Sequence, residues 1–460
     1  MRSIIGKAYL ATVAPQLHNL RQAEFMEPEQ VKALQQERLA RLLSHAYQHC
    51  PYYRRILSEA GVVDSRGRVE LAHFCRIPLL TKDILRKKLD ELKSSDLHRR
   101  RWYYNTSGGS TGEPVRFIQD AEYRLWARAV KILFDSWTGY KVGEPKVLLW
   151  GSERDLFVGK ETLRVRAIRW LKNETWLNAF RMTIDDMRRY VQIINRVRPV
   201  QILAYVESIY ELARFVEREK LVVYPPKAIM TSAGTLYQEM RRVIERVFQA
   251  PVFNRYGSRE VGDVACECET HEGLHVSSLT HYVEIVREDG TPAAPGEIGQ
   301  VVVTSLTNYA MPFIRYSIGD TASMAAGRCS CGRSWPLLQQ VYGRVTDSFV
   351  REDGGVVVPE FFIHTIGVVL YSDWIRTFQC IQEDYRVVRL RIVPAVPAQE
   401  AQRLVDSAKE KLEEMVRLVM GERCQLLIDI VDEIEPSPSG KRSYTVSRVR
   451  DRKAGEEPVG

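Results

Sequence analysis

The stretch Thr106-Ser-Gly-Gly-Ser-Thr-Gly-Glu-Pro114, continued by the strand-like Val115-Arg-Phe-Ile118, is the part of the chain on which the fold depends. Glycine adds no Cβ, and hydroxyl and backbone N–H groups donate hydrogen bonds, so such a loop can approach an anion closely. It lacks the lysine of the Walker loop and the Gly-x-Gly-x-x-Gly spacing of dinucleotide-binding loops. Taken alone, it is consistent with a polyphosphate site or with an ordinary flexible loop.

Composition indicates a folded protein of more than one domain. The chain has 460 residues, which is too long for one compact core and predicts two or three domains. Its 45% hydrophobic and 27% charged residues are ordinary for globular proteins. The net charge of +8 is spread along the chain, which favours anionic small substrates or an acidic membrane surface and argues against a nucleic-acid partner.

Lys7 interrupts what would be the apolar region of a signal peptide. No apolar run approaches the roughly 18 residues of a transmembrane segment, so we expect no such segment and a cytoplasmic protein. The eight cysteines, with two Cys-x-Cys pairs, then indicate thiols or a metal site rather than a disulfide framework.

Hydrophobic periodicity predicts the order of the elements. A helical region spans residues 28–60 with a break at Pro51, Thr81 caps another helix, and Asp120 caps a third that ends at Trp137. Short apolar runs at 146–150, 200–204, 227–231 and 251–254 alternate with helical stretches such as 207–219 and 236–248. This alternation is typical of a parallel sheet covered by helices, whose sites lie beyond the carboxyl ends of the strands.

The pattern changes after residue 281. Residues 283–287 and 300–304 predict a hairpin, and strands at 375–382, 386–393 and 425–431 surround a helix at 399–419. The expected fold class is an α/β large N-terminal domain, with parallel sheets covered by helices and an antiparallel β subdomain, followed by a small mobile α+β C-terminal domain. We place the large domain at 1–343, with a helical lead-in at 1–100 and the β subdomain at about 282–340, the small domain at 344–450 and a tail at 451–460.

Five stretches, in this order and spacing, resemble the core motifs of the adenylate-forming (ANL) superfamily of acyl-CoA synthetases, adenylation domains and luciferases. They are the glycine-rich loop, Tyr256-Gly-Ser-Arg-Glu260, Arg315-Tyr-Ser-Ile-Gly-Asp320, Gly343-Arg344-Val-Thr-Asp347 and Ser439-Gly-Lys441. The Pro312-Phe-Ile-Arg-Tyr316 form and the element Arg328-Cys-Ser-Cys-Gly-Arg333 resemble the phenylacetate-CoA ligase-like branch, particularly its CapK-type capsule-biosynthesis members.

The resemblance implies an ATP-dependent ligase that activates a carboxylic acid through an acyl-adenylate and then passes the acyl group to CoA. Capsular or exopolysaccharide biosynthesis is the context that the CapK-type likeness suggests. Two alternatives stay open: transfer to an amine, sugar or carrier protein, and a catalytically silent binding protein of a polysaccharide assembly complex. The sequence does not identify the carboxylic acid substrate or the acyl acceptor, and it does not distinguish a monomer from a homodimer.

By the same resemblance, ATP and Mg²⁺ are bound by the motif residues. Lys441, Glu260 and Arg344 would be catalytic, with Glu260 also holding Mg²⁺, Tyr256 stacking on adenine and Asp320 binding the ribose. The hinge position after the Gly-Arg motif is Thr346 where relatives often have an acidic residue. The residues that would bind the nucleotide are Thr106, Ser107, Gly108, Gly109, Ser110, Thr111, Gly112, Ser232, Ala233, Gly234, Arg255, Tyr256, Gly257, Ser258, Asp320 and Arg344.

The cysteine spacing indicates a second metal. Cys268-x-x-His271 and Cys329-x-Cys331 supply three thiols and an imidazole, as a closed structural zinc site would. The alternative is four reduced residues that never meet. The competing ligands are Cys266, which we interpret as a packed strand cysteine, and His275; the remaining residues interpreted as core or surface groups are His281, Cys50, Cys75, Cys380 and Cys424.

Overall fold

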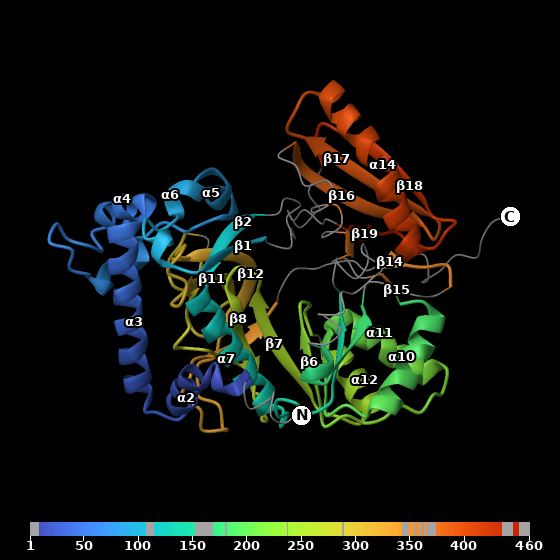
Figure 1. Cartoon of the computed structure of the whole chain (residues 1–460), viewed down its shortest axis with the longest axis horizontal. Helices are drawn as coiled ribbons and strands as arrows, with labels where there is room; N and C mark the ends of the chain where they lie inside the picture. Colours follow the sequence, from blue (N-terminus) through green and yellow to red (C-terminus); the bar gives the residue numbers. More distant parts are fainter. Residues whose placement is uncertain are drawn as a thin grey trace.

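The computed structural model shows a large part that carries a wide sheet and, above it in the view of Figure 1, a smaller C-terminal lobe. No helix among the described residues is both long and apolar enough to span a bilayer. The structure describes residues 9–106, 115–151, 169–179, 182–236, 238–287, 289–342, 349–353, 356–357, 361–362, 366, 374–434 and 445–449.

Helices dominate the first hundred residues, as predicted. Pro28 begins α3 and Pro51 begins α4, at the first helical position where a missing N–H breaks no hydrogen bond. The side chain of Thr81 accepts a hydrogen bond from the Ile84 N–H and caps α5. The elements are α2 (Ala14–Ala23), α3 (Pro28–His49), α4 (Pro51–Glu59), η1 (Leu71–Arg76), α5 (Lys82–Lys87), α6 (Leu89–Leu92) and η2 (Leu97–Arg99).

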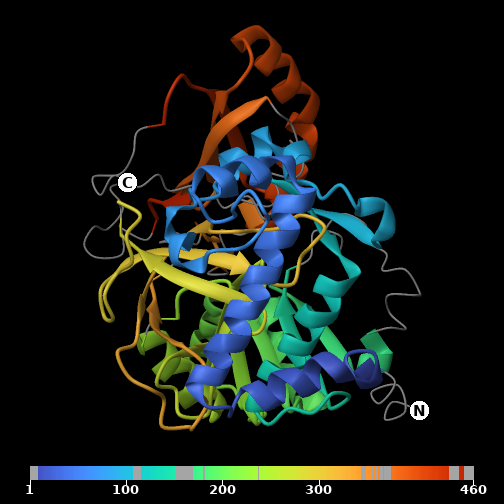
Figure 2. The ribbon, with the colours of Figure 1, turned by 90° about the vertical axis from the view of Figure 1, so that its left-hand side faces the viewer.

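This helical lead-in packs against the large sheet. In Figure 2 it lies in front of the sheet (blue), with the C-terminal lobe at the top. Leu42 and Leu43 of α3 are fully buried in the same apolar cluster as Val301 and Val303 of the sheet. Burial of this face stabilises the lead-in, because a helix in water gains most of its stability from packing of its apolar side.

The glycine-rich loop is framed by two antiparallel strands, β1 (Trp102–Thr106) and β2 (Arg116–Asp120). Thr106 pairs with Arg116, so the two ends of the loop meet. Asp120 then caps α7 (Ala121–Trp137) by accepting a hydrogen bond from the Tyr123 N–H, which confirms the predicted cap.

Five parallel strands follow: β3 (Lys146–Trp150), β4 (Glu174–Asn178), β5 (Gln201–Tyr205), β6 (Ala228–Ser232) and β7 (Val252–Ser258). The predicted alternation with helices is confirmed by α10 (Ile184–Val197), α11 (Val206–Arg218) and α12 (Gln238–Phe248). Strand β4 was not predicted, because it is a half-buried edge strand without a continuous apolar run.

The antiparallel strands are β8 (Gly262–Glu267), β9 (Leu274–Val276), β10 (His281–Val286), β11 (Gly299–Ser305), β12 (Tyr316–Met324) and β13 (Leu337–Val341). The predicted hairpin is confirmed as β10–β11, with His281 opposite Ser305. Strand β7 pairs parallel with β6 and antiparallel with β8, so eleven strands among the described residues form one sheet in the order β10-β11-β12-β13-β9-β8-β7-β6-β5-β3-β4. The β region is thus continuous with the parallel sheet rather than a sheet of its own.

The C-terminal lobe has the predicted α+β composition. A sheet of order β18-β17-β16-β19 is accompanied by α14 (Ala398–Met420). Its strands are β16 (Ile375–Asp384), β17 (Val387–Pro394), β18 (Gln425–Ile430) and β19 (Thr445–Ser447), preceded by the short pair β14 (Phe349–Val350) and β15 (Val356–Val357). The domain boundary near residue 343 and the mobility of the lobe stay predictions, since residues 343–348 lie outside the described part.

Candidate functional site

The turn between β7 and β8 carries the motif that begins at Tyr256. Gly257 lies opposite Asp263 in this hairpin, and Ser258 lies opposite Gly262. A Cβ at position 257 would lie 2.2 Å from the carbonyl oxygen of Gly262, so only glycine fits there. This tight hairpin determines where the following Glu260 is placed.

Glu260 is buried, with 5% of its surface exposed. Its Oε1 accepts a hydrogen bond of 3.1 Å from the hydroxyl of Tyr316, a fully buried residue at the start of β12. A buried carboxylate needs partners, and the tyrosine supplies one of them while other acceptor positions remain for a cation. The contact joins the Tyr256–Glu260 motif to the Arg315–Asp320 motif.

A second contact joins the same two motifs. The hydroxyl of Tyr256 donates a hydrogen bond of 3.0 Å to Oδ2 of Asp320, and both side chains are half-buried. The residues that sequence reasoning assigns to adenine and to ribose therefore lie side by side. The arrangement suits a nucleoside, which presents a flat base next to hydroxyl donors.

Strand β2 connects the glycine-rich loop to this site. The side-chain amide of Gln119 donates hydrogen bonds to the carbonyl oxygens of Arg259 (3.0 Å) and Glu260 (3.2 Å). The strand that closes the loop is thereby attached to the turn that bears the carboxylate. Of the predicted phosphate-binding residues, Thr106 ends β1, whereas Ser107–Gly112 lie outside the described residues.

The loop after β6 lies at the same edge of the sheet, because β6 and β7 are parallel neighbours. Ser232 is the last residue of β6 and is buried, and Ala233 adopts a left-handed backbone with φ of 64° before Gly234. The hydroxyl of Thr235 donates to the carbonyl oxygen of Tyr342 at 3.0 Å, directly before the Gly343-Arg344 motif. Arg344 itself, the hinge position Thr346 and Lys441 lie outside the described residues.

The two remaining predicted nucleotide residues of β7 have different environments. The guanidinium of Arg255 is 6% exposed and pairs with Asp263 at 3.3 Å, which indicates a structural role in the hairpin. The Ser258 hydroxyl is buried and has no hydrogen-bond partner among the described residues. A buried hydroxyl without a partner, two residues before Glu260 in the chain, fits a site that binds a polar ligand.

Sequence reasoning missed two residues that shape the site. Tyr316 directly follows the arginine of its motif, which was a usable signal. Gln119 carries no signal in the sequence, because its partners lie 140 and 141 residues away.

The structure corrects the predicted zinc ligand set. Ligand atoms of Cys268, His275, Cys329 and Cys331 all lie within 4.8 Å of one another. His271 is not among them: its Nδ1 lies 3.1 Å from Oε2 of Glu267 and its ring packs on Phe253.

The local backbone explains this correction. His271 lies in the turn after β8 with φ of 56°, whereas the return strand β9 brings His275 opposite Cys266. Cys266 is fully buried on β8 and outside the cluster, which confirms it as a packed strand cysteine. The other residues interpreted as core or surface groups are also confirmed: Cys75 is exposed, and His281, Cys50, Cys380 and Cys424 are buried.

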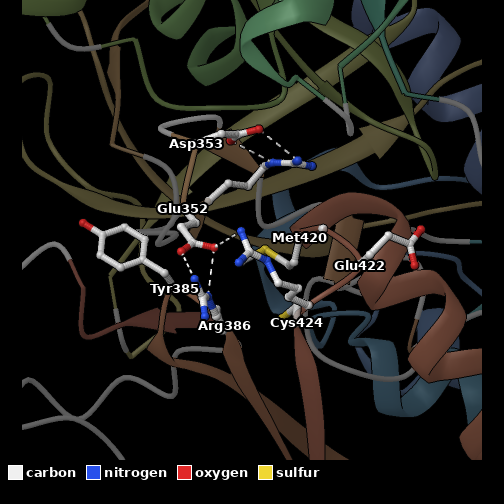
Figure 3. Close-up of a pocket in the computed structure, with 10 residues that line it drawn as sticks. Glu352, Asp353, Tyr385, Arg386, Met420, Glu422 and Cys424 are labelled. Atoms are coloured by element: carbon white, nitrogen blue, oxygen red, sulfur yellow. Dashed lines mark hydrogen bonds and ion pairs between the residues drawn. The ribbon is translucent and has the colours of Figure 1, made fainter.

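A cavity of about 440 Å³ lies in the C-terminal lobe (Figure 3). Five of its charged groups form ion pairs: Glu352 bridges Arg386 and Arg423, and Arg351 pairs with Asp353 at 3.0 Å. None of its lining residues is a predicted site residue.

Comparison with known proteins identifies relatives of this chain. Residues 349–448 match the family model of the CapK C-terminal domain. The chain is 23% identical over 419 residues to protein CapK of Staphylococcus aureus, covering 91% of this chain and 89% of that protein. It is 28% identical over 347 residues to the phenylacetate-coenzyme A ligase of Thermus thermophilus, covering 71% and 73%.

Solved structures share the fold. A 2-hydroxyisobutyryl-CoA ligase, solved with 2-hydroxyisobutyryl-AMP and CoA in its thioesterification state, matches with a TM-score of 0.62 and 20% identity, covering 94% of this chain and 93% of that one. The same enzyme in its postadenylation state matches with a TM-score of 0.58. The resemblance to phenylacetate-CoA ligases and to CapK is confirmed, and the solved acyl-CoA ligase shares the fold.

Proposed function

We propose that this homologue of CapK and of phenylacetate-CoA ligases is an AMP-forming acid–thiol ligase. It would activate a carboxylic acid with ATP as an acyl-adenylate and then transfer the acyl group to CoA. The observation that carries the proposal is the meeting of three motif regions: Gln119 of β2 holds the Glu260 turn, and Tyr256 and Glu260 contact Asp320 and Tyr316. The relatives at 28% identity, which are phenylacetate-CoA ligases, support the reaction class.

The chemistry explains the residue types. A carboxylate is a poor electrophile, so its oxygen attacks the α-phosphate of ATP, an acyl–O–P bond forms, and pyrophosphate leaves with the electron pair of the broken P–O bond. Negative charge develops on the departing phosphates. Lys441 would stabilise that charge, and the glycine-rich loop with Thr106 would hold the phosphates by N–H and hydroxyl donors. Asp320 and Tyr256 would position the nucleoside.

Mg²⁺ fits the donor set at Glu260. A carboxylate oxygen is the ligand that this ion prefers, and Mg²⁺ commonly takes one or two carboxylates together with substrate phosphates. When bound, the ion would neutralise phosphate charge as pyrophosphate leaves. The role of this chain is to hold the Glu260 carboxylate in one orientation, through the Tyr316 hydroxyl and the Gln119 contacts to its turn.

A second candidate acceptor follows from the CapK likeness. The similarity to CapK covers 91% of the chain, and the CapK C-terminal domain model matches the lobe that follows the Gly-Arg motif. An acyl-adenylate passed to a sugar or amine acceptor of polysaccharide biosynthesis is therefore the runner-up. A catalytically silent binding protein is disfavoured, because such a protein would not need all three of the residues Glu260, Asp320 and Lys441 in its sequence.

The test is carboxylate-dependent ATP–pyrophosphate exchange over a panel of aryl and alkyl acids, followed by AMP and thioester formation with and without CoA. Lys441→Ala should lower exchange by about 100-fold or more while the fold persists. The matched control is Lys409→Ala, which removes an exposed lysine charge from α14 of the same lobe and should leave exchange unchanged. Undiminished exchange in the Lys441 variant would contradict the assignment, and exchange without thioester formation would favour the runner-up acceptor.

A further inference from the structure

We propose that Cys268, His275, Cys329 and Cys331 form a closed structural zinc site that joins the β8–β9 hairpin to the connection between β12 and β13. The inference goes beyond the proposed ligase activity and does not depend on it. Four protein ligands leave no open coordination position for water or substrate, so the ion would take no part in adenylation. Cys268 directly follows β8, His275 lies on β9, and the other two cysteines precede β13.

The distances fit tetrahedral zinc. Zn–S bonds of about 2.3 Å and Zn–N bonds of about 2.0–2.1 Å imply tetrahedral edges of about 3.8 Å between sulfurs and about 3.6 Å between sulfur and nitrogen. The Sγ atoms of Cys268 and Cys329 are 3.5 Å apart, and Sγ of Cys331 is 3.3 Å from Nε2 of His275. Small side-chain movements would complete the geometry. The sulfurs are also too far apart for a disulfide, whose S–S bond is about 2.05 Å.

The surroundings favour a metal over four separate groups. Cys268 and His275 are fully buried and Cys329 is 6% exposed. Nε2 of His275 faces the sulfurs, 3.3 Å from Sγ of Cys331. Buried polar groups are normally paired or bound to metal. The backbone N–H of Arg333 points at Sγ of Cys331 at 3.4 Å, a contact that would stabilise a thiolate ligand.

The site would also anchor the helical lead-in. Two residues after Cys331, the buried guanidinium of Arg333 bonds to Glu24 at the end of α2 (2.9 Å) and to Glu269 (3.0 Å), and it lies over the ring of Trp137 at 4.7 Å. The indole N–H of Trp137 donates to the same Glu24 carboxylate at 2.8 Å. Zinc that fixes Cys331 would therefore hold Arg333 in place and, through it, the ends of α2 and α7.

Elemental analysis of the full-length protein purified without added metal is the direct test. We expect about one zinc per chain in the wild-type protein. The decisive pair is His275→Asn against His271→Asn: both change a histidine of the same hairpin region, but only the first should lose zinc. Cys329→Ser should lose it as well, whereas Cys75→Ser, at an exposed thiol, should keep it.

A second measurement does not require a folded variant. Titration of wild-type protein with an organomercurial, in the presence of a colorimetric zinc chelator, should release the zinc as the cluster thiols react. Limited proteolysis of the zinc-depleted protein should show new cleavage at the ends of α2 and α7. Wild-type protein with little zinc, loss of zinc in the His271 variant but not in the His275 variant, or a Cys268–Cys329 disulfide in anaerobically purified protein would each overturn the proposal.

Discussion

Removal of one hydroxyl group, in Tyr316→Phe, tests whether Glu260 is positioned for catalysis. The hydroxyl donates a 3.1 Å hydrogen bond to the Glu260 carboxylate, which is only 5% exposed. Hydrogen bonds to charged groups contribute about 1.5–3 kcal/mol. If this free energy is expressed in the transition state for adenylation, the rate falls by about 10- to 100-fold, since about 1.4 kcal/mol corresponds to a factor of ten.

The assay is carboxylate-dependent ATP–pyrophosphate exchange as a function of Mg²⁺ concentration. Tyr316→Phe should lower the rate and raise the Mg²⁺ concentration needed for half-maximal exchange, because the carboxylate can then rotate away from the ion. Glu260→Gln keeps the shape and removes the charge, so we expect a loss of about 100-fold or more. A role that Tyr316 exerts through Glu260 predicts that adding Tyr316→Phe to the Glu260→Gln variant has little further effect.

The matched control is Tyr190→Phe on α10. It removes the hydroxyl of a buried tyrosine, which donates a hydrogen bond of 2.9 Å to the carbonyl oxygen of Asn178. It should lower the free energy of unfolding by about 1 kcal/mol and leave exchange unchanged. The reasoning is refuted if Tyr316→Phe exchanges pyrophosphate like the wild type, or if its loss is equally large with and without the Glu260 carboxylate.

Three further predictions concern pH, packing and motion. Burial lowers the pKa of His281 to about 4, against about 6.5 in the unfolded chain. As the pH falls from about 6.5 to about 4, the unfolded chain binds this proton and the folded chain does not, so the free energy of unfolding should fall by about 1.4 kcal/mol per pH unit. Urea unfolding of His281→Gln should therefore depend less on pH than that of the wild type. The buried ion pair between Asp135 and Lys146 has an N–O distance of 2.8 Å. Asp135→Ala should lower the free energy of unfolding by about 3–5 kcal/mol because it leaves the Lys146 ammonium group buried without its partner, and adding Lys146→Met should restore part of that loss. Additive losses in a double-mutant cycle would contradict the pairing. Thr346→Pro, at the proposed hinge, should block interconversion of the two conformations and spare one half-reaction; equal residual rates of pyrophosphate exchange and thioester formation would argue against a hinge there.

Local patterns in the sequence were sufficient for many of the helices and strands and for several helix ends. Pro51 separates α3 from α4, Thr81 caps α5 and Asp120 caps α7, because each effect acts over three or four neighbouring residues. The order of the motifs predicted the resemblance to phenylacetate-CoA ligases and CapK and drew attention to Glu260 and Asp320. In the structure Glu260 accepts a hydrogen bond from Tyr316, and Asp320 accepts one from Tyr256, so the two motifs are in contact.

Only the tertiary structure decided which distant residues meet. The sequence favoured His271 because it stands three residues after Cys268, yet the β8–β9 register turns that residue toward Glu267 and brings His275 to the cysteines. Gln119 reaches a carbonyl 141 residues away, a contact that no local periodicity encodes. Strand β7 likewise shares its two edges between parallel and antiparallel partners. Pairings of this kind depend on strand register and packing across the whole sheet, which are properties of the folded chain and not of any one stretch.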